Sequence, residues 1–330
     1  MKQKIIIAIL IVVAFSITGC RYSNPVLEAK VANEQPNTPL QLEKRVEMLN
    51  SKAVNLKLDN EARIIWANPD KKEKTEYVLV YIHGFSASCK EGYPVNYDFA
   101  KRYGVNMYCA LLSEHGVADK EPMINLTAEK YLNSAKQALE IGRQLGNKVI
   151  LMSTSTGGTL SLKLAADNPD IYALIMYSPN IDVVDKRAHW LSNKIGYSLV
   201  KLFKGKMVVY NDPPEIQKYW QTFYHLNGVR AMIMLLENTM VAQTFSKVTQ
   251  PVFLGYYYKN SNEKDPTISV DALLKMYGEL GTPDSLKIKV AFANAGCHPI
   301  ASSIHNKNYI DVETKTYEFA ERVLKLKPAL

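Results

Sequence analysis

Cysteine is scarce in this sequence, with 4 among 330 residues, and their spacing gives no zinc-binding signature. The chain also has no internal repeat, no low-complexity tract and no run of basic residues, although its formal net charge is +8. These absences argue against a disulfide-rich scaffold, a structural zinc module and a nucleic-acid-binding protein. Hydrophobic residues make up 47% of the chain and charged residues 22%, which is typical of a globular protein with a sizeable core.

The N-terminus has the pattern of a secretory signal peptide. Two lysines precede the unbroken apolar run Ile5–Ala14, and small residues lead from this run to Cys20. The segment Ile17–Cys20 resembles a bacterial lipobox, which implies that residues 1–19 are removed and that Cys20 carries a lipid. A short transmembrane anchor is the alternative, but the apolar run is short for a membrane span. We therefore expect a lipoprotein of the cell envelope, anchored to a membrane outside the cytoplasm.

A polar segment rich in proline and asparagine follows the lipobox. We expect residues 20–40 to form a flexible tether that spans about 25 Å and holds the domain clear of the membrane. Residues 41–330 then form the folded domain. In an oxidising compartment, Cys89 and Cys109 can form a disulfide, or they can remain separate buried thiols together with Cys297.

Strands and helices alternate along most of the chain. Continuous apolar runs predict buried strands, and apolar residues at helical spacing predict the helices between them. We expect strands at residues 54–58, 63–66, 77–82, 105–112, 148–153, 172–177, 251–258 and 286–294, and helices at 42–49, 94–103, 128–145, 157–166, 270–280 and 309–326. This alternation predicts an α/β fold with a mostly parallel sheet flanked by helices.

Residues 182–248 depart from the alternation. They contain no evident strand and are rich in aromatic residues and methionine. We expect a helical cap inserted between two strands of the sheet. Its stretch Ala231–Leu236 contains two methionines, whose flexible side chains suit variable apolar ligands.

The strongest local motif is Ser153-Thr154-Ser155-Thr156-Gly157, where a buried strand gives way to a helix. The turn raises Ser155 to the carboxyl end of the sheet, where α/β folds place their ligands. This segment resembles the G-x-S-x-G nucleophile elbow of the α/β-hydrolase superfamily, with Ser153 in place of the first glycine. A serine-rich turn without chemistry is the alternative interpretation of the motif taken alone.

The segment His83-Gly84-Phe85 follows the strand at 77–82 and resembles the oxyanion loop of the same superfamily. The resemblance implies that the backbone amides of Phe85 and Thr156 stabilise a developing oxyanion. His83 itself is expected to be structural, since it precedes the turn.

Two later loops match the positions of the family's acid and base. Asp265 follows the strand at 251–258, where the family places its acid, and Glu263 is the alternative. His298 follows the last strand, where the family places its general base, and His305 is the competitor.

Nucleophile, acid and base thus occur in the chain order of the α/β-hydrolases, and the resemblance covers residues 76–326. Within the superfamily, the sequence is most similar to the monoacylglycerol-lipase-like and carboxylesterase-like members. This implies hydrolysis of small apolar acyl esters through an acyl-enzyme intermediate, with no metal or cofactor. A serine peptidase or acyltransferase, and a non-catalytic binding lipoprotein of the envelope, are the alternatives.

Overall fold

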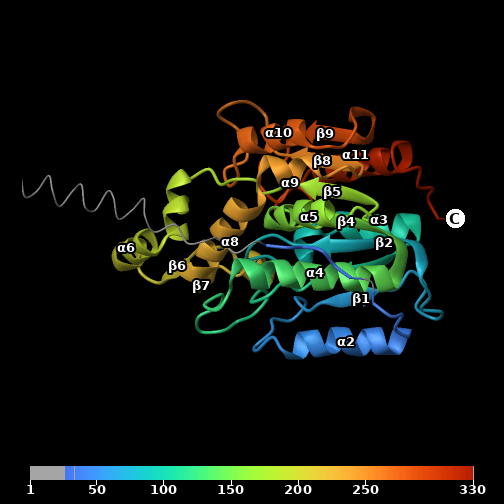
Figure 1. Cartoon of the computed structure of the whole chain (residues 1–330), viewed down its shortest axis with the longest axis horizontal. Coiled ribbons are helices and arrows are strands. Elements are labelled where there is room, and N and C mark those ends of the chain that lie inside the picture. Colours follow the sequence, from blue (N-terminus) through green and yellow to red (C-terminus); the bar gives the residue numbers. More distant parts are fainter. Residues whose placement is uncertain (1–26, 33, 330) are drawn as a thin grey trace, which may run out of the picture.

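The computed structural model describes residues 27–32 and 34–329. One seven-stranded sheet has the order β1-β3-β2-β4-β5-β8-β9, with helices on both faces (Figure 1). Its strands are β1 (Arg63–Ile65), β2 (Thr75–Ile82), β3 (Asn106–Cys109), β4 (Gly146–Thr154), β5 (Ala173–Tyr177), β8 (Val252–Tyr256) and β9 (Lys287–Ala291). Only β1 runs antiparallel to its neighbour. The predicted α/β fold with a mostly parallel sheet is confirmed.

The helices divide between the two faces of the sheet. They are α2 (Pro39–Ser51), α3 (Val95–Tyr103), α4 (Ala128–Leu145), α5 (Thr156–Asp167), α10 (Val270–Glu279) and α11 (Tyr309–Arg322). Buried side chains of α4, α5 and α10 join one apolar cluster, and those of α3 and α11 join a second one. Helix α4 begins at Thr127, whose hydroxyl accepts a hydrogen bond from Lys130 N, and it buries Tyr131, Ala135 and Leu139 at helical spacing.

The cap lies between β5 and β8 and forms one end of the molecule (Figure 1). Its helical elements are η2 (Lys186–Ser192), α6 (Lys194–Lys204), α7 (Pro214–Tyr219), α8 (Leu226–Thr239) and α9 (Ala242–Ser246). The expectation that this insertion has no strand is wrong. Strands β6 (Met207–Val209) and β7 (Phe223–His225) pair antiparallel, and three residues are too few to give a periodic signal.

The start of the described chain is packed on the domain. Leu27, Ala29 and Val31 are buried, and Ala29 N donates a hydrogen bond to the Asp167 carboxylate at 2.8 Å. The expectation of a flexible tether over residues 20–40 is therefore wrong for this part, because alternate apolar side chains are buried against the domain. The predicted edge strand at 54–58 is also wrong, since it contributes only one isolated bridge, from Leu56.

The predicted signal peptide, residues 1–19, and the predicted lipidation site Cys20 lie outside the described residues. Within the described residues, no helix combines the length and apolar character needed to cross a membrane.

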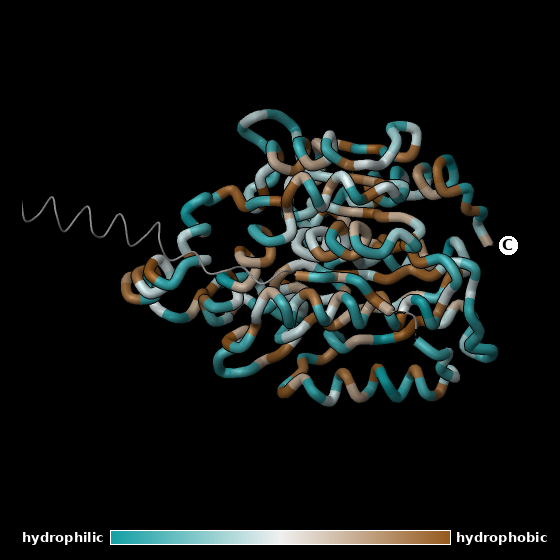
Figure 2. Tube along the Cα trace, viewed as in Figure 1, coloured by the Kyte–Doolittle hydropathy of each residue, from teal (hydrophilic) through white to brown (hydrophobic). Residues whose placement is uncertain are grey.

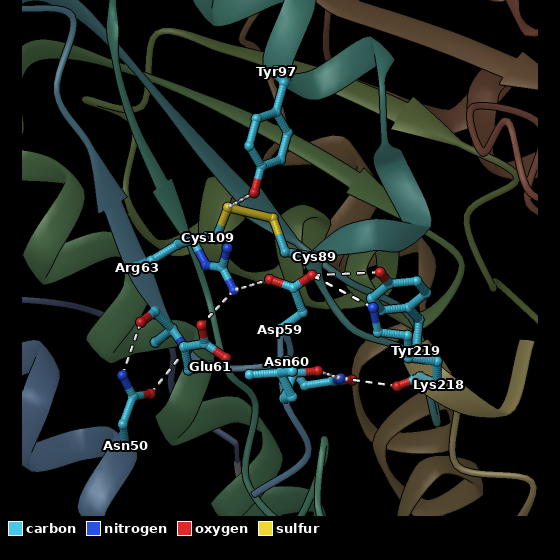
Figure 3. Close-up of polar contacts among 12 residues, drawn as sticks. Asn50, Asp59, Asn60, Glu61, Arg63, Cys89, Tyr97, Cys109, Lys218 and Tyr219 are labelled. Atoms are coloured by element: carbon cyan, nitrogen blue, oxygen red, sulfur yellow. Dashed lines mark hydrogen bonds and ion pairs between the residues drawn. A yellow bond between two sulfur atoms is a disulfide. The ribbon is translucent and has the colours of Figure 1, made fainter. Parts of the chain in front are cut away.

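Cys89 and Cys109 form a disulfide, with their Cα atoms 5.5 Å apart (Figure 3). This decides between the two interpretations of the cysteines, and in the part of the chain that the structure describes Cys297 is the free cysteine. The bond ties the short 3-10 helix η1 (Cys89–Gly92), which follows the loop at residues 83–88, to the end of β3. The loop and the sheet edge beside it are thereby held together.

A second connection joins the N-terminal part of the domain to helix α7 of the cap. The ammonium group of Lys57 donates to the carbonyl oxygens of Gln217 (2.6 Å) and Trp220 (2.9 Å) at the end of α7. Close by, Asn60 Nδ2 donates to the carbonyl of Lys218 at 2.9 Å (Figure 3). Burial lowers the pKa of Lys57 to about 8, since the charged ammonium loses water there.

Candidate active site

Ser155 lies on a sharp turn between β4 and α5. Its backbone has φ 54° and ψ −124°, a conformation that residues other than glycine rarely adopt and that is concentrated at functional sites. Two residues on, a Cβ on Gly157 would lie 2.0 Å from the carbonyl oxygen of Ile82, so only glycine fits there. Ser153, in the place of the motif's first glycine, is fully buried in β4 and is accommodated without a break in the strand. The turn therefore has the geometry of a nucleophile elbow.

Asp265 and His298, from the loops after β8 and β9, meet at the same edge of the sheet. His298 Nδ1 and Asp265 Oδ2 are 2.7 Å apart, and the Asp265 side chain is fully buried. The other oxygen of Asp265 accepts hydrogen bonds from the amides of Thr267 (2.9 Å) and Ile268 (3.2 Å). These two amide hydrogen bonds fix the carboxylate of Asp265. Because Nδ1 of His298 faces this carboxylate, Nε2 on the other side of the ring points away from it.

The pKa values of this pair are shifted in opposite directions. Burial alone lowers the pKa of His298, but the charge and hydrogen bond of Asp265 outweigh burial and hold it above its ordinary value. For Asp265, burial raises the pKa, and the charge and hydrogen bond of His298 with the two backbone amides bring it below its ordinary value. The carboxylate is therefore ionised near neutral pH, and the imidazole is a stronger base than a free histidine.

The loop after β2 is held by His83. Leu112 N donates to His83 Nε2 at 3.2 Å, so the ring proton is on Nδ1, which donates to the Gly84 carbonyl at 2.8 Å. Burial lowers the pKa of His83 to about 4, so the ring is neutral. Because the peptide is planar, fixing the Gly84 oxygen also fixes the N–H of Phe85. His83 is thus structural, as expected.

The amide of Thr156 belongs to the first residue of α5. Two later amides of this helix start are already used, since Gly158 N (2.8 Å) and Thr159 N (3.4 Å) both donate to the Ser155 carbonyl. Amides at a helix start lack an intrahelical acceptor and carry a partial positive charge. Thr156 N is therefore suited to an anionic oxygen beside Ser155.

A cavity of about 520 Å³ opens over these groups, which is a size typical of small-molecule sites. Ser155, His298 and Phe85 all line it. The lining combines apolar and polar side chains; the apolar ones include Val183, Val208, Leu226, Val229 and Met232, and the polar ones include Asp212, Gln221, Thr222 and His305.

The alternative acid and base have other surroundings. Glu263 is exposed and forms an ion pair with Lys259 at 2.9 Å. His305 lines the cavity, but its ring packs edge-on against Trp220, with the ring centroids 4.7 Å apart, whereas the carboxylate of Asp265 is bonded to His298. Among residues 27–32 and 34–329, no three His, Cys, Asp or Glu side chains are grouped as a metal site would require.

No protein-family model and no curated protein sequence matches this chain. Solved structures do match over most of its length. A structure from work on LipS and LipT, two metagenome-derived lipolytic enzymes, has a TM-score of 0.64 and 12% identity over 80% of this chain and 98% of the other. The chain has the α/β-hydrolase fold.

Two further structures agree with this assignment at similarly low identity. The monoacylglycerol lipase of Paleococcus ferrophilus has a TM-score of 0.52 and 12% identity, over 77% of this chain and 98% of its own. A thermophilic esterase from Thermogutta terrifontis has a TM-score of 0.53 and 14% identity, over 80% of this chain and 94% of its own.

One group beside Ser155 was missed by the sequence analysis. Glu91, on η1, is buried, and its Oε2 accepts a hydrogen bond from Gly84 N at 2.6 Å. A Cβ on Gly84 would lie 2.8 Å from Glu91 Oε1 and 2.9 Å from Ser155 Cβ, which places the carboxyl group close to Ser155. Burial raises the pKa of Glu91 to about 7, although the Gly84 amide and His298 act against this shift. A buried glutamate with a perturbed pKa in a cleft is a typical feature of a functional site.

Proposed function

We propose that this protein is a serine hydrolase of carboxylic esters. Ser155 is the nucleophile, His298 the general base, and Asp265 the acid that orients the base. The observation that carries the proposal is the 2.7 Å contact between His298 Nδ1 and the buried Asp265, with His298 lining the same cavity as the strained elbow serine. The similar folds of a lipase, an esterase and a lipolytic enzyme support the ester class.

The reaction follows from these groups. His298 Nε2 accepts the proton of Ser155 as Oγ adds to the ester carbonyl, and the amides of Phe85 and Thr156 stabilise the oxyanion. Collapse of the tetrahedral intermediate breaks the ester bond, and the proton on His298 passes to the leaving alcohol. A water molecule then attacks the acyl-enzyme with the same base, which releases the acid and restores Ser155.

The lining of the cavity suits an ester with an apolar acyl chain. Met232, from the Ala231–Leu236 stretch, and the other apolar side chains can contact that chain. Asp212 and Gln221 can form hydrogen bonds with a leaving alcohol. We propose small apolar acyl esters as the substrate class.

The lipobox-like sequence at Ile17–Cys20 supports a second part of the proposal, that the mature protein is a lipoprotein of the cell envelope. Mass spectrometry of the mature N-terminus tests it. We expect diacylglycerol on Cys20, and an unmodified chain that keeps residues 1–19 contradicts it.

A panel of p-nitrophenyl esters of increasing chain length tests the hydrolase proposal, with aminoacyl-nitroanilides as peptidase substrates. We expect ester hydrolysis that Ser155→Ala abolishes and Ser153→Ala retains. Ser153 is a matched control because it is a buried serine two residues before Ser155, in β4. Cleavage of nitroanilides alone indicates a peptidase, and folded protein inactive on both contradicts a hydrolase.

A further inference from the structure

Helix α6 of the cap exposes an apolar stripe. Its members are Ile195, Leu199, Leu202 and Phe203, with Leu202 74% and Phe203 78% exposed. Their spacing of i, i+4, i+7 and i+8 places them along one side of the helix. A surface helix usually turns its apolar side to the core, whereas this helix turns much of it outward.

Neighbouring parts of the cap extend this stripe into a patch. Trp190 is 61% exposed and lies against α6, since a Cβ on Gly196 would meet the Trp190 backbone at 2.1 Å. Val209, Tyr210 and Phe223 of the adjacent hairpin are also exposed. Figure 2 shows apolar residues gathered on α6, at the outer end of the cap. Exposed apolar patches of this kind mark interaction surfaces.

The charges on α6 indicate what covers the patch. The helix has no acidic residue, and Lys201 and Lys204 are exposed on it. Lys206, just beyond its end, is paired with Glu121. Exposed apolar side chains combined with lysines on the polar side are the pattern of a helix that lies in the plane of a membrane interface. Anionic lipid headgroups complement the lysines.

The start of the described chain and α6 both lie near α8. The guanidinium of Arg230, near the start of α8, lies 5.0 Å from the Tyr197 ring of α6. Asn238, near the end of α8, lines a cavity together with Leu27. The α-helical rise from Arg230 to Asn238 is about 12 Å.

The packing of residues 27–32 also shortens the distance between the domain and a lipid on Cys20. From Cys20 to Leu27 the fully extended chain reaches at most about 25 Å. If Cys20 carries the anchor, Leu27 lies within this distance of the lipid, whereas a fully extended tether of residues 20–40 would reach about 70 Å. The surface around α8, including α6, is then held near the bilayer.

We propose that α6 binds the headgroup region of a bilayer that contains anionic lipids, as a second membrane contact beside the anchor. The patch adjoins the cavity, since Val208 and Tyr210 flank exposed Val209 and line the cavity wall. An apolar ester can therefore pass from the bilayer to the cavity across this surface. The docking itself does not depend on the proposed hydrolase activity.

Quenching of tryptophan fluorescence by brominated phospholipids tests the contact in the full chain bound to vesicles. Phe203→Trp probes the patch, and Ile310→Trp is the control. Ile310 is 58% exposed on α11, and α11 and α8 pack on opposite faces of the sheet. The vesicles contain phosphatidylcholine and phosphatidylglycerol. We expect brominated lipid to reduce the fluorescence added by Phe203→Trp by at least about half, and to change the fluorescence added by Ile310→Trp by no more than about a tenth.

Charge reversal provides the second measurement. We expect the quenching at position 203 to be weaker in pure phosphatidylcholine, and Lys201→Glu with Lys204→Glu to remove the gain given by phosphatidylglycerol. Equal quenching at positions 203 and 310, or none at 203, overturns the proposal. A blue shift at 203 that depends on protein concentration without vesicles also overturns it, because a second copy of the chain then covers the patch.

Discussion

At the scale of single residues, the contact between His298 and Asp265 sets the expected pH dependence. Ester hydrolysis needs neutral His298, and Asp265 raises the pKa of this histidine, so kcat/KM is lost as pH falls through that raised value. We expect the acid limb of the pH profile above about 6.5, the ordinary value for histidine.

Asp265→Asn removes the charge that raises this pKa. We expect the acid limb to move to lower pH and kcat to fall by roughly 10⁴-fold, because the amide does not hold the ring in the same tautomer. Steady-state kinetics between pH 5 and pH 9 measure both effects. An unchanged profile excludes Asp265 as the partner of the base.

Glu91 gives a second prediction at this scale. Glu91→Gln keeps an oxygen that accepts the hydrogen bond of Gly84 N and removes a charge that raises the pKa of His298. We expect the acid limb of kcat/KM to move to lower pH, with the melting temperature retained. Glu263→Gln is the control, because that glutamate is exposed, and it leaves the limb in place. A limb that does not move with Glu91→Gln gives Glu91 a structural role only.

Ser155, Asp265 and His298 could be predicted because each follows a predicted strand at the position where the resemblance to the α/β-hydrolases implies that group. Glu91 could not be predicted in the same way. It lies on a four-residue 3-10 helix, and nothing in a polar segment such as Cys-Lys-Glu-Gly indicates that the glutamate is buried while the lysine is not. Its burial follows from contacts with Gly84, which no periodic pattern in the sequence indicates.

At the scale of elements, the disulfide secures η1 and therefore Glu91. It closes a loop of 20 residues, for which chain entropy gives a stabilisation of about 3 kcal/mol. We expect Cys89→Ser with Cys109→Ser to lower the free energy of unfolding by about that amount in urea denaturation. Addition of a reductant to the wild type should have the same effect, and it should leave the double variant unchanged. A wild type insensitive to reductant contradicts this role.

The contact between Lys57 and helix α7 gives another prediction for an element. Lys57→Ala removes two hydrogen bonds from a charged donor, each contributing about 1.5–3 kcal/mol. We expect amide exchange at residues 217–221 to accelerate at least about tenfold in hydrogen–deuterium exchange measurements. Lys52→Ala, which removes an exposed lysine of the same region, should leave this exchange unchanged. Equal exchange in the two variants contradicts the contact.

Long buried elements were predictable, and short or surface-packed ones were not. The strand at 148–153 and the helix at 128–145 were predicted close to their observed bounds because their periodicity is strong. Hairpin β6–β7 has three residues per strand, and residues 27–32 are held by hydrogen bonds to Asp167 and Asn168 that lie far away in the sequence. Such contacts depend on the fold as a whole.

At the scale of the whole molecule, the sheet brings the three chemical groups together from distant parts of the chain. Ser155 and His298 are 143 positions apart, and they line one cavity because their loops share the carboxyl edge of a parallel sheet. The cap covers this edge and carries the exposed patch on α6. The proposed ester hydrolase site and the proposed membrane-facing surface therefore lie within one domain.

Reaction with a fluorophosphonate, followed by mass spectrometry of the digested protein, tests the central claim most directly. We predict one covalent phosphonate per chain, on Ser155, with no labelling of Ser155→Ala and wild-type labelling of Ser153→Ala. His298→Ala should slow the labelling of Ser155 by several orders of magnitude, because the general base is lost. Folded wild-type protein that remains unlabelled, or a phosphonate on another residue, would contradict the assignment of Ser155 as the nucleophile.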